Sequence, residues 1–377
     1  KAYADGNKIV YASDCDSTKD KYAVKVSLAD SDGTAVGTEQ TNAAGSFDNL
    51  EVGKYKITAT LSDGTTEKKK VEKTINIKNL DDMSAYLFVH FVDTQEDATR
   101  EQIYFSVSKD GKTWTTLNNK QPYLTSNVGT QGVRDPYILR GEDGKFFIIA
   151  TDLSVYNLKN NWTAAAQQGS KSIVVWESSD LVNWSEASLV KINNDNAGCT
   201  WAPEACYDPE KDEYMVFWAS VVSDDSYQKY RIYRSYTKDF KTFSAPELYI
   251  EEPNAVIDTT IIDHEGTYYR FTKNEAKSSI TMQECTSLSG DWKDVANYNL
   301  GSMTGYEGPT IYKLNGKNEW CLLLDYFSKS KGYKPFVTTD ITKGEFTADS
   351  DFSFDGTYRH GTVMPITQAE YERLTAE

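Results

Sequence analysis

The feature that most constrains the fold of this chain is a loose internal repeat. Residues 108–114 comprise the end of a strand-like segment, a polar turn and then Trp114. The same pattern recurs four times further along the chain. The later aromatic anchors follow at spacings of 49 to 70 residues and are Trp184, Phe243, Trp292 and Phe346. Each repeat has room for four short strands, and five such repeats predict a five-bladed β-propeller. Tandem β-sandwiches are the alternative architecture.

Closure of this propeller needs a contribution from the end of the chain. Residues 86–91, the first strand-like segment of the repeat region, already have the pattern of a second strand, so the first blade lacks its inner strand. Residues 361–366 can supply that strand. Because an unclosed ring would leave sheet edges exposed, we expect both ends of the repeat region to share one blade.

Residues 1–80 have a different pattern. Segments 23–28, 55–61 and 71–77 are separated by turns that include two Asp-Gly pairs, and they alternate with period two, which predicts a small antiparallel β-sandwich. Residues 45–55 resemble the hallmark stretch of bacterial immunoglobulin-like accessory modules. We therefore expect an immunoglobulin-like β-sandwich at 1–80 and the all-β propeller at 81–377. Acidic, basic and nucleophilic residues are not clustered in this first part of the sequence, which favours the role of a spacer over that of a carbohydrate-binding module.

The composition limits the classes of partner. The formal net charge of −16 disfavours nucleic acid and anionic membranes, because both select basic surfaces. This negative charge is compatible with a neutral ligand such as a glycan. It can also be explained by solubility alone. No apolar run reaches the length of a transmembrane helix. The chain starts at Lys1 without a signal-peptide pattern, so we expect a mature or trimmed form whose location follows from its function.

Cysteine and histidine usage gives little indication of a metal or disulfide framework. The five cysteines have no CxxC pair, and we expect mostly buried thiols with at most one or two disulfides; they are Cys15, Cys199, Cys206, Cys285 and Cys321. The three histidines, His90, His264 and His360, lack the spacing of zinc ligands.

Each presumed inner strand begins with a carboxyl group or a histidine at nearly the same point. These residues are Asp135, Glu204, Asp258, Glu307 and His360. Inner strands run parallel around the axis of a propeller, so we expect the five side chains to converge at one mouth. Crowded carboxyl groups repel one another and resist desolvation. Any one of them could merely cap a strand, but five together indicate a site that is used or that binds a metal.

Carboxyl groups in this arrangement match one chemistry in particular. Hydrolysis of a glycosidic bond needs one carboxyl group to protonate the leaving oxygen and another to activate water or to attack the anomeric carbon. A third carboxylate can hold the pKa of the acid high through like-charge repulsion. The sequence therefore predicts glycoside hydrolysis by Asp135, Asp258 and Glu307.

The same residues carry a family resemblance. Residues 134–136, 254–258 and 306–309, with a late Arg359-His360-Gly361, resemble glycoside hydrolase family 43, and the likeness spans residues 85–370. The resemblance implies Asp135 as general base, Asp258 as pKa modulator and orienter, and Glu307 as general acid. It also implies inversion at the anomeric carbon, with base and acid roughly 6.5–9.5 Å apart. No cofactor is implied for the chemistry.

Two further residues take their expected roles from this resemblance. His360 falls where the family has an axial histidine, and the resemblance implies that a structural calcium ion can bind there through water. Glu204 departs from the pattern, because relatives commonly have Asp at that point of the Trp-Ala-Pro motif.

Substrate-binding groups are expected around the same mouth, because the second strands return to it. Their ends carry His90, Asp152, Lys273, Glu275 and Asp325, while Trp201 and Tyr306 offer ring faces to a sugar. Each of these residues could instead serve packing or a loop. The full set expected to bind substrate is Arg134, Asp152, Trp201, Glu204, Lys273, Glu275, Tyr306, Asp325, Arg359 and His360.

The favoured activity is exo-acting release of terminal α-L-arabinofuranose or β-D-galactofuranose from polysaccharide. The long stretch before Asp135, residues 121–136, is more similar to the arabinofuranosidase and galactofuranosidase branches of the family than to arabinanase-type openings. β-Xylosidase and endo-arabinanase are rival activities, and a non-catalytic carbohydrate-binding propeller is a rival class. The expected partners are arabinose- or galactofuranose-containing glycans, and the expected location is secreted or at the cell surface.

Overall fold

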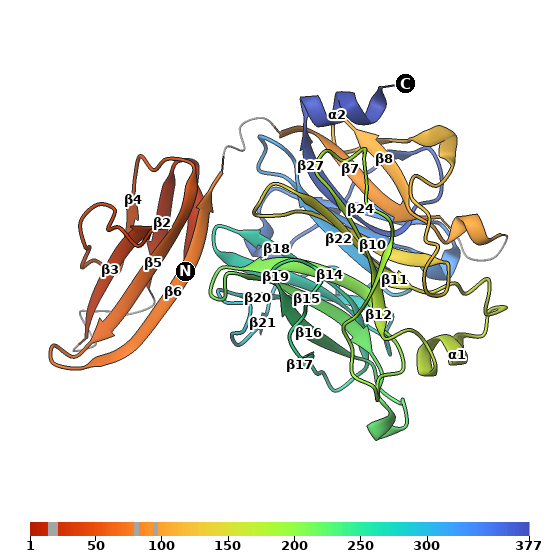
Figure 1. The fold of residues 1–377 in the computed structure, drawn as a ribbon, viewed down its shortest axis with the longest axis horizontal. Helices are drawn as coiled ribbons and strands as arrows, with labels where there is room; N and C mark the ends of the chain where they lie inside the picture. Colours follow the sequence, from red (N-terminus) through yellow and green to blue (C-terminus); the bar gives the residue numbers. More distant parts are fainter. Residues whose placement is uncertain (14–21, 79–82, 93–96, 377) are drawn as a thin grey trace.

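The computed structural model describes residues 1–13, 22–78, 83–92 and 97–376, and these residues form an almost entirely β structure (Figure 1). The two α-helices are short: α1 (Trp162–Gln167) and α2 (Gln368–Thr375). Within the described ranges, no helix has the length and apolar character needed to cross a bilayer.

The first part of the chain consists of two three-stranded sheets that share one apolar core. One sheet has the order β1 (Ala2–Asp5), β2 (Lys8–Ala12), β4 (Ala44–Phe47), and the other has the order β3 (Ala23–Asp30), β5 (Gly53–Ser62), β6 (Glu67–Ile77). Buried and exposed residues alternate along the first six positions of β3, as a half-buried strand requires. Ile9, Val26 and Ile57 lie in the shared core. The immunoglobulin-like character of this part stays a prediction.

Four regular blades follow, each a four-stranded sheet in sequence order. Blade 1 contains β10 (Val133–Arg140), β11 (Phe146–Asp152), β12 (Ser172–Ser178) and β13 (Ser188–Lys191). Blade 2 contains β14 (Trp201–Asp208), β15 (Glu213–Ser220), β16 (Arg231–Thr237) and β17 (Glu247–Ile250). Blade 3 contains β18 (Val256–His264), β19 (Thr267–Asn274), β20 (Ser279–Cys285) and β21 (Lys293–Asp294). Blade 4 contains β22 (Glu307–Lys313), β23 (Trp320–Asp325), β24 (Tyr333–Thr338) and β25 (Thr347–Ala348).

A closing blade joins the two ends of the repeat region, as the sequence predicts. Its order is β26 (Ser353–Phe354), β9 (Thr113–Thr116), β8 (Tyr104–Ser108), β7 (Met83–Phe91), β27 (Arg359–Thr367). Strand β27 is the missing inner strand and pairs antiparallel with β7. The inner strands β27, β10, β14, β18 and β22 contact one another in a closed ring. The five-bladed β-propeller is therefore confirmed.

The repeated turn has a local physical cause. Asp180 Oδ1 accepts hydrogen bonds from the backbone N–H groups of Val182 and Asn183, at 2.9 and 2.7 Å. Asp110 and Asp239 accept the equivalent pairs in their own repeats. An aspartate that bonds its own backbone two and three residues on fixes a turn, which explains why the repeat is visible in the sequence.

The aromatic anchors after these turns are buried to different degrees. Trp114 and Phe346 are fully buried, whereas Trp184, Phe243 and Trp292 are half-buried against the core clusters. In blades 1 and 2 the fully buried turn residues are Leu181 and Phe240.

Four of the five cysteines lie in the described ranges, and all four are free thiols. Cys199 and Cys321 are buried, and Cys206 and Cys285 are half-buried. Cys15 lies outside the described residues.

Strand β6 contacts the propeller at the turns that follow β10, β14 and β20. The Nζ of Lys73 donates to the carbonyl of Thr286 at 3.0 Å and lies 3.3 Å from Glu210. Asn76 and Lys78 both bond Glu142. Residues 142 and 210 follow the C-terminal ends of β10 and β14, whereas the predicted catalytic residues lie near the N-terminal ends of inner strands. The first part of the chain therefore contacts the face opposite the predicted mouth.

Candidate active site

In each inner strand the regular alternation of side chains between the two faces is interrupted within the first few residues. Asp135, Ala202, Asp258 and Gly308 occupy equivalent places in blades 1 to 4 and have φ angles between +47° and +51°. The strand register shifts at each of these points, and also near the start of β27. The left-handed conformation costs about 1–2 kcal/mol for a residue with a Cβ. It turns the strand so that consecutive side chains, such as those of Arg134 and Asp135, both reach one cavity.

In blade 4 the acidic residue, Glu307, comes one position before the residue with the left-handed conformation. The packing around that next residue explains this order. The residue is Gly308, and a Cβ there would lie 2.7 Å from the Cγ of His360. The imidazole ring therefore fills the space that a side chain would need. Glu307, the preceding residue, places its carboxylate in the cavity instead.

The cavity at this mouth has a volume of about 710 Å³. Nine of the residues predicted from the sequence line it: Arg134, Asp135, Trp201, Asp258, Lys273, Glu275, Glu307, Arg359 and His360. They come from all five blades.

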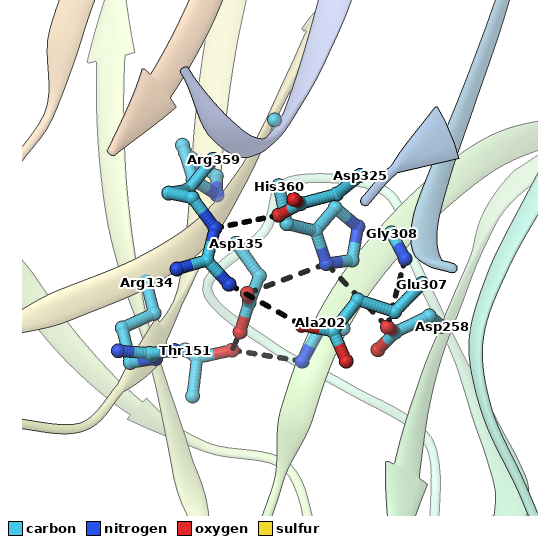
Figure 2. Close-up of polar contacts among 12 residues, drawn as sticks. Arg134, Asp135, Thr151, Ala202, Asp258, Glu307, Gly308, Asp325, Arg359 and His360 are labelled. Carbon is cyan, nitrogen blue, oxygen red and sulfur yellow. Dashed lines mark hydrogen bonds and ion pairs between the residues drawn. The ribbon is translucent and has the colours of Figure 1, made fainter. Parts of the chain in front are cut away.

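Asp135 is held on both carboxylate oxygens (Figure 2). Its Oδ2 accepts from the Thr151 hydroxyl at 2.9 Å, and the same hydroxyl accepts from the Ala202 N–H at 2.8 Å. Its Oδ1 lies 3.3 Å from Nδ1 of His360. Burial by itself would raise the pKa of Asp135, but the hydrogen bond and charge of His360 outweigh it and the pKa lies below its usual value. Asp135 is therefore ionised at neutral pH.

His360 and Asp258 shift each other's protonation. Burial by itself would lower the pKa of His360, but the charges of Asp258 and Asp135 raise it to about 9, so the ring is an imidazolium at pH 7. Burial raises the pKa of Asp258 to about 6, against the opposing charge of His360 and with the like charge of Glu307 adding to it. The N–H of Gly308 donates to Asp258 Oδ2 at 3.0 Å.

Glu307 lies between two cations. Lys273 Nζ is 2.9 Å from its Oε2, and Arg359 Nη2 is 3.4 Å from its Oε1. Lys273 also pairs with Glu275 at 2.8 Å, and Arg359 Nε donates to Asp325 at 2.7 Å. Burial by itself would lower the pKa of Lys273, but the surrounding carboxylates, Glu307 first, raise it. Both cations stay charged and fix the position of the Glu307 carboxylate.

Four residues expected to bind substrate lie outside the cavity lining: Glu204, described below, and Asp152, Tyr306 and Asp325. Asp152 accepts from the N–H and hydroxyl of Thr130, at 2.8 and 2.9 Å, and so anchors the preceding loop. Tyr306 stacks on Tyr326 with ring centroids 4.4 Å apart. Asp325 is fully buried and pairs with Arg359. Of these last three side chains, Asp325 contacts a residue of the lining directly, and it orients Arg359 from outside the cavity.

Glu204 is placed differently from the other four residues, because its carboxyl group lies within electrostatic range of His360 and Asp258 but not in the cavity lining. Glu204 lies two residues beyond the break in β14, where Ala202 takes the place that Asp135 and Asp258 occupy in their strands. It is 2% exposed and does not line the cavity. Burial raises the pKa of Glu204 to about 8, so this carboxyl group is mostly neutral at pH 7.

His90 is also placed away from the cavity. Its Nε2 bonds the Ser106 hydroxyl at 2.9 Å, and its ring stacks on Tyr358 at 3.9 Å. Burial lowers the pKa of His90 to about 4, so it is a neutral packing residue of the closing blade.

Sequence reasoning missed half of the cavity wall. The additional lining residues are Phe91, Leu153, Trp162, Tyr230, Ile257, Ser278, Phe327, Ser330 and Thr357. Trp162, in α1, meets Trp201 edge-on at 6.2 Å, and Trp201 stacks on Tyr230 at 5.4 Å. A tryptophan after two asparagines in a polar segment was the available signal for Trp162.

A metal at His360 stays a prediction. In the described part of the chain, no three His, Cys, Asp or Glu side chains are grouped so as to hold a metal ion. The Nδ1 atom of His360 is turned toward two carboxylates. The residues present therefore do not form a calcium cage, which uses six to eight oxygen ligands, and no step of the reaction is assigned to a metal.

Comparisons with known proteins identify the family of this chain. A family model of proteins related to glycoside hydrolase family 43, described as a probable glycosyl hydrolase domain, matches residues 81–372. A curated α-L-arabinofuranosidase of Bifidobacterium longum subsp. longum is 30% identical over 385 aligned positions, which cover 89% of this chain and 35% of that protein. The chain therefore spans about a third of the length of this relative.

Solved structures show weaker likenesses. A thermostable family 43 glycoside hydrolase has a TM-score of 0.44 at 19% identity, covering 62% of this chain and 77% of its own. An α-L-arabinanase of Cellvibrio cellulosa has a TM-score of 0.49 at 14% identity, covering 75% of this chain and all of its own. The family match rests on the sequence model and on the curated relative. This chain belongs to the glycosyl hydrolases related to glycoside hydrolase family 43.

Proposed function

We propose that this chain is an inverting, exo-acting glycosidase that releases terminal α-L-arabinofuranose from polysaccharide. The observation that carries the proposal is the set Asp135, Asp258 and Glu307, which opens from three blades into one cavity. The name of the curated relative, an α-L-arabinofuranosidase, supports the choice of sugar. A polysaccharide substrate favours a secreted or cell-surface location, and the reaction needs no cofactor.

Asp135 takes the role of general base in this proposal. It is ionised at neutral pH, and Thr151 and His360 hold its two oxygens, so its orientation is set before substrate arrives. A carboxylate so placed can accept a proton from a water molecule that attacks the anomeric carbon. Inversion follows if that water, and not the carboxylate, attacks.

Glu307 takes the role of general acid. After it gives its proton to the leaving oxygen it becomes a carboxylate, and Lys273 and Arg359 are in place to stabilise that charge. Burial, with the like charge of Glu307 adding to it, raises the pKa of Asp258 to about 6. At mildly acidic pH Asp258 therefore retains a proton beside the proposed acid.

The rival readings differ in product. A β-D-galactofuranosidase or a β-xylosidase would release another sugar, an endo-arabinanase would release oligosaccharides, and a carbohydrate-binding propeller would bind without turnover. The carboxylate set and its fixed hydrogen bonds favour an enzyme over a binding module.

Three p-nitrophenyl glycosides test the proposal: α-L-arabinofuranoside, β-D-galactofuranoside and β-D-xylopyranoside. We expect the highest kcat/KM on the arabinofuranoside, and free arabinose as the first product from linear arabinan. Asp135→Asn, purified in parallel, controls for contaminating activity, because loss of the base should abolish turnover on all three substrates. No turnover on any of the three substrates by the folded wild-type chain would contradict the proposed function, and oligosaccharides as first products would contradict exo action.

A further inference from the structure

A buried carboxylate outside the predicted catalytic set connects three segments at the edge of the cavity. Glu101 is fully buried, and its oxygens accept four hydrogen bonds. The donors are Arg134 Nη1 at 3.1 Å, the Ser154 hydroxyl at 3.0 Å, and the N–H groups of Val155 and Tyr156 at 2.9 and 3.0 Å. Glu101 therefore fixes Arg134 together with the turn that leads to Trp162.

The Arg134 guanidinium lies close to two aromatic rings. Its Cζ is 4.5 Å from the ring centre of Phe91 and 5.3 Å from that of Trp162. Among the described residues, Nη1 is the guanidinium nitrogen with a hydrogen-bond partner, Glu101. Arg134 also lines the cavity beside Asp135 (Figure 2). Because Arg134 lines the cavity, its remaining N–H donors have the cavity as their outlet.

A second arginine on the same strand shows what a purely structural pair looks like. Arg140, at the other end of β10, also covers an aromatic ring, with its Cζ 4.6 Å from the centre of Phe146. It binds the buried Glu370 through both Nη atoms, at 2.7 and 2.8 Å. Both Nη atoms of Arg140 are thus bound by its partner, whereas Glu101 takes up one nitrogen of Arg134 and leaves the others available.

We propose that Arg134 is a sugar-recognition residue that donates hydrogen bonds to hydroxyl oxygens of the sugar whose bond is cleaved, and that Glu101 is its positioning residue. The inference rests on the proposed function, because it places a neutral sugar next to Asp135. Glu101 acts by fixing the guanidinium and by fixing the turn that carries Trp162 against it. A guanidinium held in one orientation loses less conformational entropy on binding than a free one.

Three variants test this inference on the full chain: Glu101→Gln, Arg134→Met and the double variant. Hydrogen bonds to charged groups are strong, so we expect kcat/KM on p-nitrophenyl α-L-arabinofuranoside to fall roughly tenfold or more in each single variant, mostly through KM. Because both residues act through one guanidinium, the double variant should lose little beyond Arg134→Met alone.

Glu370→Gln is the matched control, because it perturbs the equivalent pair at the other end of β10. It should lower Tm and leave KM within about twofold. The inference is overturned if Glu101→Gln lowers Tm but leaves KM unchanged, or if the two single losses multiply in the double variant.

The inference and the proposed function fail on different measurements. Wild-type chain without turnover on any aryl glycoside contradicts the function. Sugar binding is then followed through tryptophan fluorescence with arabinose as the probe, since Trp162 and Trp201 line the cavity. Equal affinities of wild type and Glu101→Gln, or absence of binding in both, overturn the inference in that experiment.

Discussion

Nδ1 of His360 lies 3.3 Å from Asp135 and 3.9 Å from Asp258, so one imidazolium serves two of the three candidate catalytic carboxylates. The pKa values of the two acids nevertheless shift in opposite directions. The pKa of Asp135 is lowered, whereas burial and the charge of Glu307 keep the pKa of Asp258 raised to about 6. One carboxyl group is thereby prepared to accept a proton while its neighbour tends to retain one.

Removal of the imidazolium should shift the pH profile of the reaction. In His360→Gln, Asp135 stays buried but loses its cation, so its pKa rises. The acidic limb of kcat/KM should move to higher pH, because Asp135 must be ionised to act as base. His264→Gln, at the last residue of β18 and outside the cavity lining, is the control and should leave the profile unchanged. If the acidic limb of kcat/KM did not move in His360→Gln, ionisation of Asp135 would not be the event that sets this limb.

The same residue makes stability depend on pH. The pKa of His360 is about 9 in the folded chain against 6.5 for an ordinary histidine, so the folded state binds the proton more tightly. Its stabilising contribution is fully present below about pH 6.5 and is lost as pH rises through about 9. Urea midpoints of wild type should therefore decline between those values more steeply than the midpoints of His360→Gln. Parallel curves for the two proteins would show that the charge of His360 does not contribute.

Replacement of the proposed acid should affect substrates according to their leaving groups. Glu307→Gln keeps the shape of the side chain but cannot donate a carboxylic proton. We expect a loss of roughly two or more orders of magnitude on arabinan oligosaccharides, whose leaving groups need protonation. The p-nitrophenyl glycoside has a good leaving group and should lose much less. Equal and mild losses on both substrates would remove Glu307 from the role.

The stereochemistry of the product tests the role of Asp135. Asp135→Asn should abolish turnover while still binding sugar, because the change is nearly isosteric but the amide cannot accept a proton from water. Proton NMR of the first-formed sugar from the wild type should show inverted configuration. Retained configuration would mean a double displacement and would contradict the role of Asp135 as the base that activates the attacking water.

The contact between β6 and the propeller should contribute stability without affecting turnover. Lys73 is buried, and its Nζ bonds the Thr286 carbonyl and Glu210. Lys73→Met leaves both partners without their cation, and we expect a loss of about 1–3 kcal/mol in unfolding free energy. Turnover should be unchanged, because the contact lies at the face opposite the cavity. Lys69→Met, at an exposed position of the same strand, is the control. Equal unfolding curves for the two variants would mean that the Lys73 contact contributes nothing.

The sequence by itself determined the blades and most of the charged site. Asp110, Asp180 and Asp239 bond backbone groups two and three residues away, so the turn that defines the repeat is a local interaction that one segment encodes. The inner strands could then be aligned, and the alignment placed Asp135, Asp258 and Glu307 at one mouth. The need to close the ring identified β27 as the missing strand.

Only the tertiary structure decided where Glu204 lies and what holds Arg134. A left-handed residue in each inner strand shifts the alternation of side chains, and nothing in the local pattern of residues 201–204 shows that Ala202 occupies that place. Glu101, Phe91 and Trp162 meet Arg134 from three separate segments. Their contacts form when the blades close around the axis, and a contact between distant segments leaves no periodic signal in either one.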